Sequence, residues 1–279
     1  MSGRAPGGTL FVEGVGFWAP TLPRWAHARA AFRGEAAPAA PVKRPAPELL
    51  AAAERRRAPD TVALALEVAA AAVHASGRAA DALPSVFTSA HGDLAVNDYM
   101  CATLAREPTL ISPTRFHNSV HNAAAGYWTI ATGCRATSTA LSAFDTSFGA
   151  VLLEAASQCL ADMTPVLLVA FDVEVTGPLA TVTRSDGLLA CALVLAPSKG
   201  NRSIAALDWS LAPRPSAAPA LRSAAARALA GNAMAGALPF LELIATATDD
   251  EASLALPLSA SLALALRLRQ LAAIEVNGA

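Results

Sequence analysis

Two short apolar runs constrain the fold of this chain more than any other feature. The first, VLLVAFDVEV, covers residues 166–175, and the second, LLACALVLA, covers residues 188–196. Both runs are short and bounded by turn-forming residues, which is typical of the central strands of a sheet that helices cover on both faces. The sequence therefore predicts a layered α/β fold.

The composition suits such a fold. Hydrophobic residues make up 54% of the 279 residues but aromatic residues only 5%, so alanine, leucine and valine must build most of the core. Small side chains of this kind allow helices to pack closely on a sheet. A single domain often reaches this length, and we expect one domain over residues 1–279.

Local patterns predict the other elements. The helix with the clearest boundaries follows Pro59-Asp60-Thr61 and ends before Gly77. A second helix is expected from Asn118 or Ser119 to Gly133, with Val120 on its buried face. Further elements are expected as a helix over residues 144–159 that buries one side, a short helix near residues 220–230, and strands at residues 10–16, 85–89, 134–139 and 203–211, the last as an antiparallel neighbour.

The end of the chain is rich in leucine with an unusual spacing. From residue 254 to residue 268 every leucine is at an even position, namely 254, 256, 258, 262, 264, 266 and 268. Side chains of a strand alternate between its two faces, so this spacing predicts a hairpin with one leucine face.

Several functional classes are disfavoured. The formal net charge is −1 and the basic residues are scattered, so we expect no nucleic-acid partner. The chain start lacks the apolar stretch of a secretory signal, and the uncharged residues 252–266 are too few to cross a membrane, so a cytoplasmic protein without a membrane span is expected. The four cysteines form no CxxC pair, which predicts reduced thiols, no metal and no cofactor.

Three segments in a fixed order carry a more specific resemblance. They are VEGVGFWAP at residues 12–20, SPTRFHNSVHNAAAGYWTIATG at residues 112–133 and ATSTALSAFDTSFGAVLLEA at residues 136–155. In this order they resemble the first half of the thiolase-type β-ketoacyl synthases. They are similar in particular to the ketosynthase-like N-terminal-domain proteins called chain length factors, of aryl polyene and related pigment gene clusters. The resemblance covers roughly residues 11–197.

This resemblance implies a thiolase-like layered α-β-α fold. Residues 1–200 would form the ketosynthase N-terminal half, and residues 201–279 a reduced C-terminal part. It also implies a heterodimer with an active β-ketoacyl synthase, whose growing chain is carried by an acyl carrier protein. The strand at residues 134–139 would meet its counterpart in the partner edge to edge.

The departures from the ketosynthase motif imply a subunit without catalytic residues of its own. Thr139 and Ala140 align with the residues before the active-site cysteine, so Leu141 stands at the nucleophile position and cannot form a thioester. A condensing enzyme also needs two histidines from its second half to stabilise the developing enolate. All five histidines of this chain precede residue 122. Such a subunit would shape the acyl tunnel of its partner, as a chain length factor does.

Ten residues are expected at the substrate tunnel or the partner interface. They fall in the second and third motif segments and are Phe116, His117, Asn118, His121, Asn122, Thr139, Leu141, Ser142, Phe144 and Asp145.

The two histidines of this set are open to more than one interpretation. His117 and His121 are four residues apart, as in HExxH zinc sites, but Asn118 stands in place of the glutamate that serves as base. In the structural interpretation, His117 and Asn118 cap the helix while His121 and Asn122 bond buried backbone groups near the interface. In the functional one, they lie beside the partner's active site.

Two other functions are alternatives to the subunit hypothesis. The chain would be an acyltransferase or a chain-initiating enzyme if Ser142 or a cysteine served as nucleophile, although Asp145 is a weak base without a positioned histidine. Alternatively, it would be a free-standing acyl-binding domain. As a structural residue, Ser142 would simply occupy the first turn of a helix, with Asp145 favourably placed at the helix N-terminus.

Overall fold

The computed structural model describes residues 7–247 and 251–271. Its strands are β1 (Gly7–Trp18), β2 (Ser85–Thr88), β3 (Ser138–Leu141), β4 (Val166–Asp172), β5 (Leu189–Ala196), β6 (Ala205–Pro213), β7 (Ala252–Pro257) and β8 (Leu262–Gln270). Its α-helices are α1 (Trp25–Phe32), α2 (Ala52–Arg57), α3 (Asp60–Ser76), α4 (Leu94–Arg106), α5 (Pro113–Asn118), α6 (Ala123–Thr132), α7 (Ser147–Ala161), α8 (Ala224–Arg227) and α9 (Leu238–Thr246). Short 3-10 helices are η1 (Ala80–Ala82), η2 (Pro108–Leu110), η3 (Phe144–Thr146), η4 (Pro178–Thr181) and η5 (Ala233–Ala237).

The strands form one eight-stranded mixed sheet in the order β3-β2-β4-β5-β1-β6-β8-β7. Strands β3, β2 and β4 are parallel to one another, and the remaining neighbours are antiparallel. The two apolar runs form β4 and β5, whose residues are buried throughout. The central strands are therefore where the sequence predicts them, and β3 lies at one edge of the sheet.

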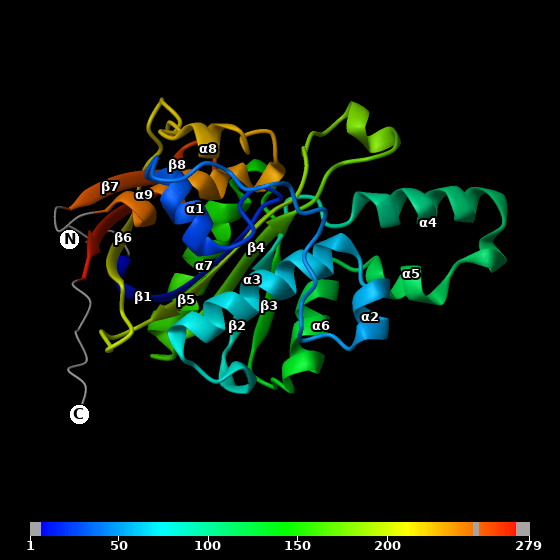
Figure 1. Ribbon diagram of the computed structural model, residues 1–279, viewed down its shortest axis with the longest axis horizontal. Helices are drawn as coiled ribbons and strands as arrows, with labels where there is room; N and C mark the ends of the chain where they lie inside the picture. Colours follow the sequence, from blue (N-terminus) through cyan, green and yellow to red (C-terminus); the bar gives the residue numbers. More distant parts are fainter. Residues whose placement is uncertain (1–6, 248–250, 272–279) are drawn as a thin grey trace.

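Helices cover both faces of the central strands, and each face has its own core. Helices α3 and α6 pack with Leu167, Val169 and Val194 on one face. Helices α1, α7 and α9 pack with Leu168 and Leu193 on the other. Figure 1 shows α3 in front of the sheet and α7 behind it. This layering explains why both strands are apolar without alternation.

Strand β1 contains a bulge at Glu13, where the pairing with β5 shifts register between Val12 and Gly14. The extra residue changes which side chains face the α7 core, so that Gly14 and Gly16 turn toward α3. A Cβ atom at Gly16 would lie 2.0 Å from the carbonyl oxygen of Val68. Only glycine allows the helix to lie this close to the strand.

The helix expected from Asn118 or Ser119 to Gly133 is wrong at its start. Helix α5 ends at Asn118, and α6 begins only at Ala123, with Gly133 in the left-handed conformation at its end as expected. Ser112 starts α5 by accepting a hydrogen bond from the backbone N–H of Arg115. Val120 lies in the break between the helices and is 50% exposed, so it does not belong to a buried face.

The next two boundaries are also displaced. The strand expected at residues 134–139 is β3, which begins at Ser138 and ends at Leu141. The following helix, expected over residues 144–159, begins at Ser147 because residues 144–146 form the 3-10 turn η3. From Phe148 to Cys159 the expected face is buried, whereas Phe144 is 53% exposed.

The last part of the chain continues the same sheet. The segment expected at residues 203–211 is antiparallel as predicted, but it pairs with β1 and β8 as strand β6. The helix expected near residues 220–230 is limited to α8. The leucine hairpin is present as β7 and β8, with Leu256, Leu264, Leu266 and Leu268 buried, and Leu262 partly exposed near the turn.

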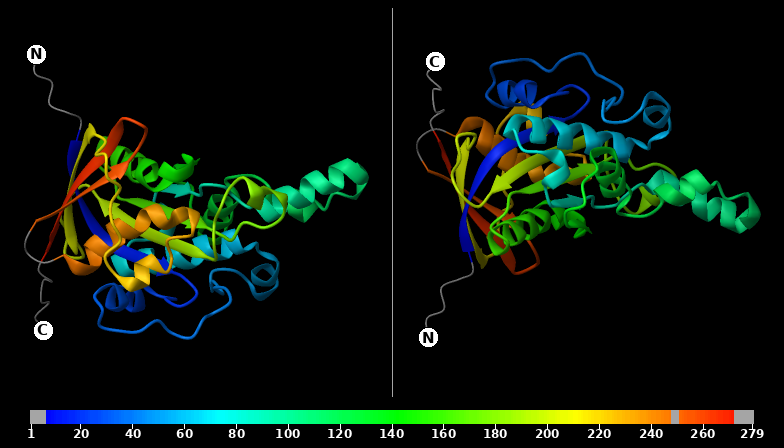
Figure 2. Two further views of the ribbon diagram at one scale, coloured as in Figure 1. Left: turned by 90° about the horizontal axis from the view of Figure 1, so that it is seen from above. Right: turned by 90° about the horizontal axis from the view of Figure 1, so that it is seen from below.

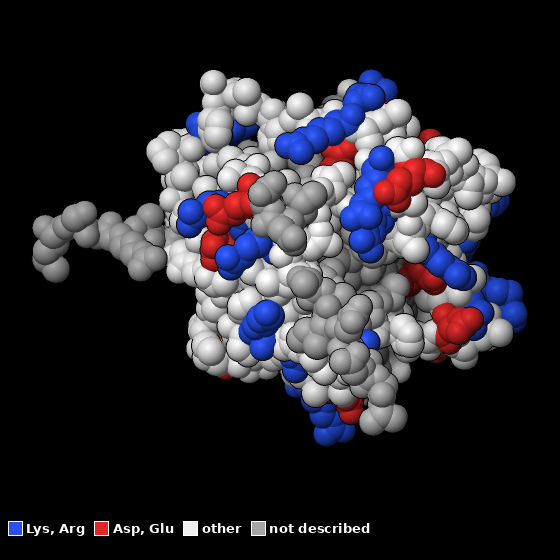
Figure 3. Space-filling view, turned by 60° about the vertical axis from the view of Figure 1, so that its left-hand side comes forward, with Lys and Arg blue, Asp and Glu red and all other residues white. Residues whose placement is uncertain are grey.

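Helices α4 and α5 extend away from the sheet as an arm, which Figures 1 and 2 show from three directions. They contact one another and η2 rather than the central strands. Within residues 7–247 and 251–271, no helix combines the length and the apolar character needed to cross a membrane. On the face shown in Figure 3, basic and acidic side chains are interspersed rather than separated into patches.

Candidate functional site

The loop that follows β2, residues 89–93, is the centre of the candidate site. The Ser89 hydroxyl donates a hydrogen bond of 2.6 Å to the Asp172 carboxylate and accepts one of 2.8 Å from the backbone N–H of Gly92. The backbone N–H of Ala90 donates to the second carboxylate oxygen of Asp172 at 2.9 Å. Strand β4 therefore holds the loop in one conformation through its last residue.

Asp172 is 1% exposed and makes a structural clamp rather than an acid or base that substrate can reach. Burial raises the pKa of the Asp172 carboxyl, and the hydrogen bonds from Ser89 and Ala90 oppose this shift. The side-chain amide of Asn232 donates to the Asp172 backbone carbonyl at 3.4 Å. Both oxygens of the Asp172 carboxylate already accept hydrogen bonds from the loop, so its role is to hold the loop in place.

The loop joins the two motif segments that the sequence singled out. The Nε2 atom of His121 lies 3.2 Å from the carbonyl oxygen of Ser89, and the Ser142 hydroxyl donates to the carbonyl oxygen of Ala90 at 2.9 Å. His121 therefore contacts a backbone carbonyl, as the structural interpretation expects, whereas no side-chain hydrogen bond joins Asn122 to another described residue. One short loop therefore contacts both His121 and Ser142, which belong to different motif segments.

Phe144 packs on the same loop from the η3 side. Its ring meets the ring of His91 edge to face, with centroids 5.4 Å apart. Phe144 has a φ of 51°, in the left-handed region that an aromatic residue rarely adopts. On the other side of the loop, Nε2 of His91 lies 2.9 Å from the Thr183 hydroxyl, which ties the β4–β5 connection to the site.

Leu141 ends β3 beside this loop. The Thr88 hydroxyl donates to the Leu141 carbonyl at 3.0 Å, and the half-buried leucine side chain packs against the core. Ser142, one residue on, donates its hydroxyl hydrogen bond to a backbone carbonyl oxygen, which is not a base. The Asp145 side chain is exposed and makes no hydrogen bond or ion pair with another described residue. Neither hydrogen bond therefore joins Leu141 or Ser142 to a basic side chain.

The other expected site residues are not gathered at the loop. The Thr139 hydroxyl accepts a hydrogen bond from Gln158 on α7, and the His117 ring packs edge to face on Tyr127. Phe116 and Asn122 are exposed, with Phe116 on the arm.

The expected helix caps are wrong. Ser112 caps α5, and Asn122 precedes α6 without a side-chain hydrogen bond. Asn118 is instead 6% exposed, and its Oδ1 atom has no hydrogen-bond partner among the described residues. An orphaned buried amide beside an exposed surface is unusual, because such atoms are normally satisfied.

Sequence reasoning missed the residues that fix the loop, namely Ser89, Asp172 and Asn232. The only local signal was an acidic residue at the end of the apolar run of β4. Across residues 7–247 and 251–271, no group of three histidine, cysteine, aspartate or glutamate side chains is placed to hold a metal ion.

Comparison with known proteins now places this fold in a class. Residues 24–260 match the family described as β-ketoacyl synthase, N-terminal domain. The chain therefore belongs to this family, and the match continues beyond residue 197, where the motif resemblance ends. No curated protein sequence matches.

Solved structures of the same fold are distant in sequence. One chain of the ketosynthase ApeO in complex with its chain length factor ApeC from Xenorhabdus doucetiae is 22% identical, with a TM-score of 0.71 over 94% of this chain and 99% of that chain. A chain of the ishigamide ketosynthase/chain length factor is 17% identical, with a TM-score of 0.73 over 95% of this chain and 100% of that chain. A chain of the AntDE:AntF complex, a type II PKS acyl-carrier protein with its ketosynthase bound to the hexaketide, is 12% identical, with a TM-score of 0.73 over 95% of this chain and 100% of that chain. The expected thiolase-like layered fold is confirmed.

Proposed function

We propose that this chain is a chain-length-factor-type subunit, which pairs with an active β-ketoacyl synthase and shapes its acyl tunnel. The observation that carries the proposal is a set of exposed apolar side chains on the arm and on the two elements that precede and follow β3 in the chain. Six large apolar residues, four on or next to the arm, one on α6 and one in η3, are each half or more exposed, and we call them the arm surface: Leu104, Leu110, Phe116, Val120, Ile130 and Phe144. Exposed large apolar residues are often covered in a protein interface.

The edge of the sheet supports the same interface. Strand β3 pairs with β2 on one side, and no other described strand pairs with its second side. An unpaired edge offers backbone N–H and C=O groups to a strand of another chain. A partner strand aligned with β3 would also cover Thr139, which lies in this strand.

The lengths of the matched chains support the pairing. In the three complexes, the match spans nearly all of this chain and 99% or 100% of the matched chain, so the two chains are of similar size. Two of these complexes are described as a ketosynthase with a chain length factor, and the third includes an acyl carrier protein. We therefore propose a ketosynthase and an acyl carrier protein as the partners, in the cytoplasm.

A subunit without its own chemistry is the form of this proposal that the site supports best. Leu141 stands at the position of the nucleophile in the ketosynthase motif. The Ser142 hydroxyl donates its hydrogen bond to a backbone carbonyl and not to a basic side chain. Phe144 and Leu141 would instead act by their bulk, as side chains that limit how far an acyl chain extends. The substrate tunnel itself would form only with the partner in place.

The rival function is an acyltransferase or chain-initiating enzyme that uses Ser142 or a cysteine. Its one supporting observation is that the Ser142 hydroxyl is exposed at the end of β3. Intact-protein mass spectrometry after incubation with acyl carrier thioesters separates the two proposals. A covalent acyl adduct on this chain would establish the rival.

Co-expression tests the main proposal directly. With a full-length β-ketoacyl synthase from the same gene cluster, we expect a stable one-to-one complex on size-exclusion chromatography. Expressed alone, the chain should self-associate, because the arm surface stays uncovered. A well-behaved monomer that ignores the ketosynthase would overturn the proposal, and saturable acyl binding by that monomer would favour a free-standing acyl-binding domain.

A further inference from the structure

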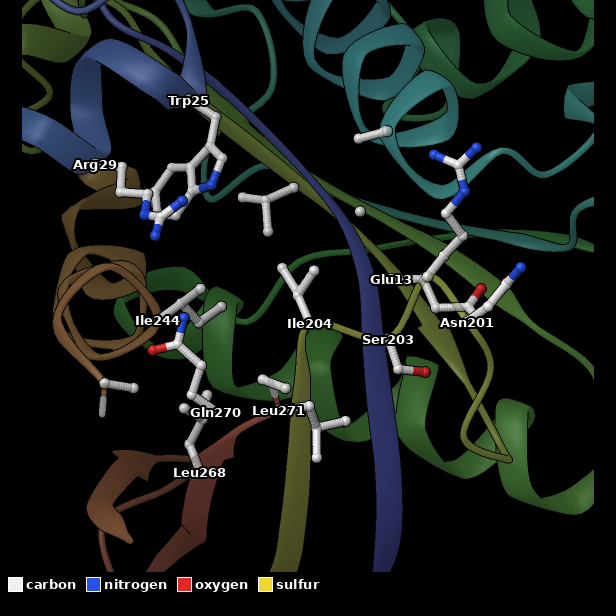
Figure 4. A pocket seen from close by; sticks show the side chains of 16 residues that line it. Glu13, Trp25, Arg29, Asn201, Ser203, Ile204, Ile244, Leu268, Gln270 and Leu271 are labelled. Carbon is white, nitrogen blue, oxygen red and sulfur yellow. The ribbon is translucent and has the colours of Figure 1, made fainter. Parts of the chain in front are cut away.

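A cavity of about 460 Å³ lies far from the arm surface, between α1, β1, the start of β6 and the ends of α9 and β8 (Figure 4). Ala205 lines it and pairs with Val12, which in turn pairs with Leu195 opposite Val166, the first residue of β4. The β2–α4 loop contacts the last residue of β4 instead. The cavity is thus at the other end of the sheet from the candidate site.

One side of the cavity is apolar. Trp25, Ile204, Ile244 and Leu268 line it, and Figure 4 shows Ile204 at the centre with Trp25 and Ile244 around it. Ile204 is 38% exposed although its neighbour Ala205 is buried, so part of its side chain is available to an apolar ligand. The volume falls within the range of sites for small organic ligands.

The charges at the cavity favour an anion. Arg29 and Arg202 line it, and neither guanidinium makes a hydrogen bond or ion pair with another described residue. Among the described residues, the one acidic group that lines the cavity, Glu13, is already neutralised by two hydrogen bonds from Arg78. The described lining therefore carries two guanidinium groups in excess.

Arg29 is placed to combine charge recognition with apolar contact. It is one helical turn after Trp25 on α1, so both side chains point to the same side, as Figure 4 shows. A planar guanidinium binds a carboxylate through two parallel hydrogen bonds. The amide of Gln270 also lines this side of the cavity and makes no side-chain hydrogen bond with another described residue.

We propose that this cavity binds an amphiphilic carboxylate, with the carboxylate on Arg29 and the apolar body against Trp25, Ile204 and Ile244. The site is separate from the proposed heterodimer surface. Self-association through the arm surface would leave the cavity accessible, so the two proposals can fail independently.

Equilibrium dialysis of the full chain against radiolabelled decanoate tests this proposal. We expect one decanoate to bind per chain, and decanol or decyltrimethylammonium to compete weakly or not at all, because neither offers a carboxylate. Arg29→Gln should weaken decanoate binding by about tenfold or more, since it removes a charge-assisted pair. Ile204→Trp should also weaken binding, because the larger side chain occupies part of the cavity.

Arg24→Gln is the matched control, because Arg24 precedes the same helix but does not line the cavity. It should bind decanoate like the unmodified chain. Circular dichroism melting would verify that each variant is folded. Absence of saturable decanoate binding, or binding by the Arg29→Gln and Ile204→Trp variants as tight as that of the unmodified chain, would overturn the proposal.

Discussion

Arg78 donates two hydrogen bonds to the buried carboxylate of Glu13, from Nε to Oε2 at 2.8 Å and from Nη2 to Oε1 at 2.9 Å. Glu13 is the bulged residue of β1 and is 3% exposed, whereas Arg78 follows the end of α3. The hydrogen bond to Glu13 raises the pKa of Arg78, which therefore stays charged. The pair thus connects the bulge to the helix that packs on it.

Replacing Arg78 with methionine would leave the Glu13 carboxylate buried and unpaired. We expect Arg78→Met to lower the free energy of unfolding by about 2 kcal/mol, toward the low end for such pairs because Arg78 is partly exposed. Urea unfolding measures this change. The double variant Glu13→Gln/Arg78→Met should recover part of the loss, since no buried charge remains. A loss no larger than that of Arg106→Met, at an exposed position, would contradict the expectation.

The heterodimer surface can be tested at one position without disturbing the fold. Ile130 on α6 is 80% exposed, so Ile130→Glu should leave the thermal stability of the isolated chain unchanged. In a complex the carboxylate would be buried against apolar groups, and co-purification with tagged ketosynthase should fall by about tenfold or more.

Met163→Glu is the control for this variant. Met163 is 65% exposed in the turn between α7 and β4, away from the arm surface. The Met163→Glu variant should co-purify the ketosynthase as well as the unmodified chain does. If Ile130→Glu and Met163→Glu co-purify the ketosynthase equally well, the arm surface is not the interface.

Phe144 offers a test of tunnel shaping that separates strain from function. Its left-handed backbone costs about 1–2 kcal/mol, which Phe144→Gly would relieve, while loss of the contact with His91 would cost about 0.5–1.5 kcal/mol. Stability should therefore change little. If the ring limits the acyl chain, the complex with Phe144→Gly should make longer products, measured by mass spectrometry of carrier-bound chains.

Phe144→Tyr keeps the ring and should keep the product length. An identical product distribution from the glycine and tyrosine variants would exclude Phe144 as a limit on chain length, whatever their stabilities.

The strands β4 and β5 and the leucine hairpin could be predicted because burial alone dictates their residues. Leu167 and Leu168 both face a helix-covered side, so neither position admits a polar residue. Leu264, Leu266 and Leu268 share one face of β8, which a period of two reveals directly. Such patterns are local, and no knowledge of the partner strands is needed to recognise them.

The candidate site depends on contacts between distant segments and could be predicted only in part. Nothing near Asp172 indicates that its carboxylate binds Ser89, because the contact exists only once β4 lies beside β2. The interruption of the helix between Asn118 and Ala123 was missed for a different reason. Its residues suit a helix, but Ser112 and Pro113 start an earlier one that ends first. Tertiary context overrides such weak local preferences.

The four cysteines provide a final test of burial. Cys134, Cys159 and Cys191 are buried, whereas Cys101 on α4 is exposed. Burial raises the pKa of Cys159 to about 12 and that of Cys191 to about 12, so both stay as unreactive thiols near neutral pH. Iodoacetamide at about pH 8 should therefore modify Cys101 alone in the folded chain, as counted by intact-protein mass spectrometry.

The same shifts set a pH dependence. An unfolded cysteine ionises near its ordinary pKa of 9.0, but the folded thiols hold their protons to higher pH. The unfolded state then binds fewer protons, so the free energy of unfolding should fall as the pH rises above about 9.

In the iodoacetamide experiment, Cys101→Ser should abolish labelling of the folded chain, and urea should expose the other three thiols. Modification of Cys159 or Cys191 before unfolding would show that the core around α7 and β5 opens more readily than this packing allows.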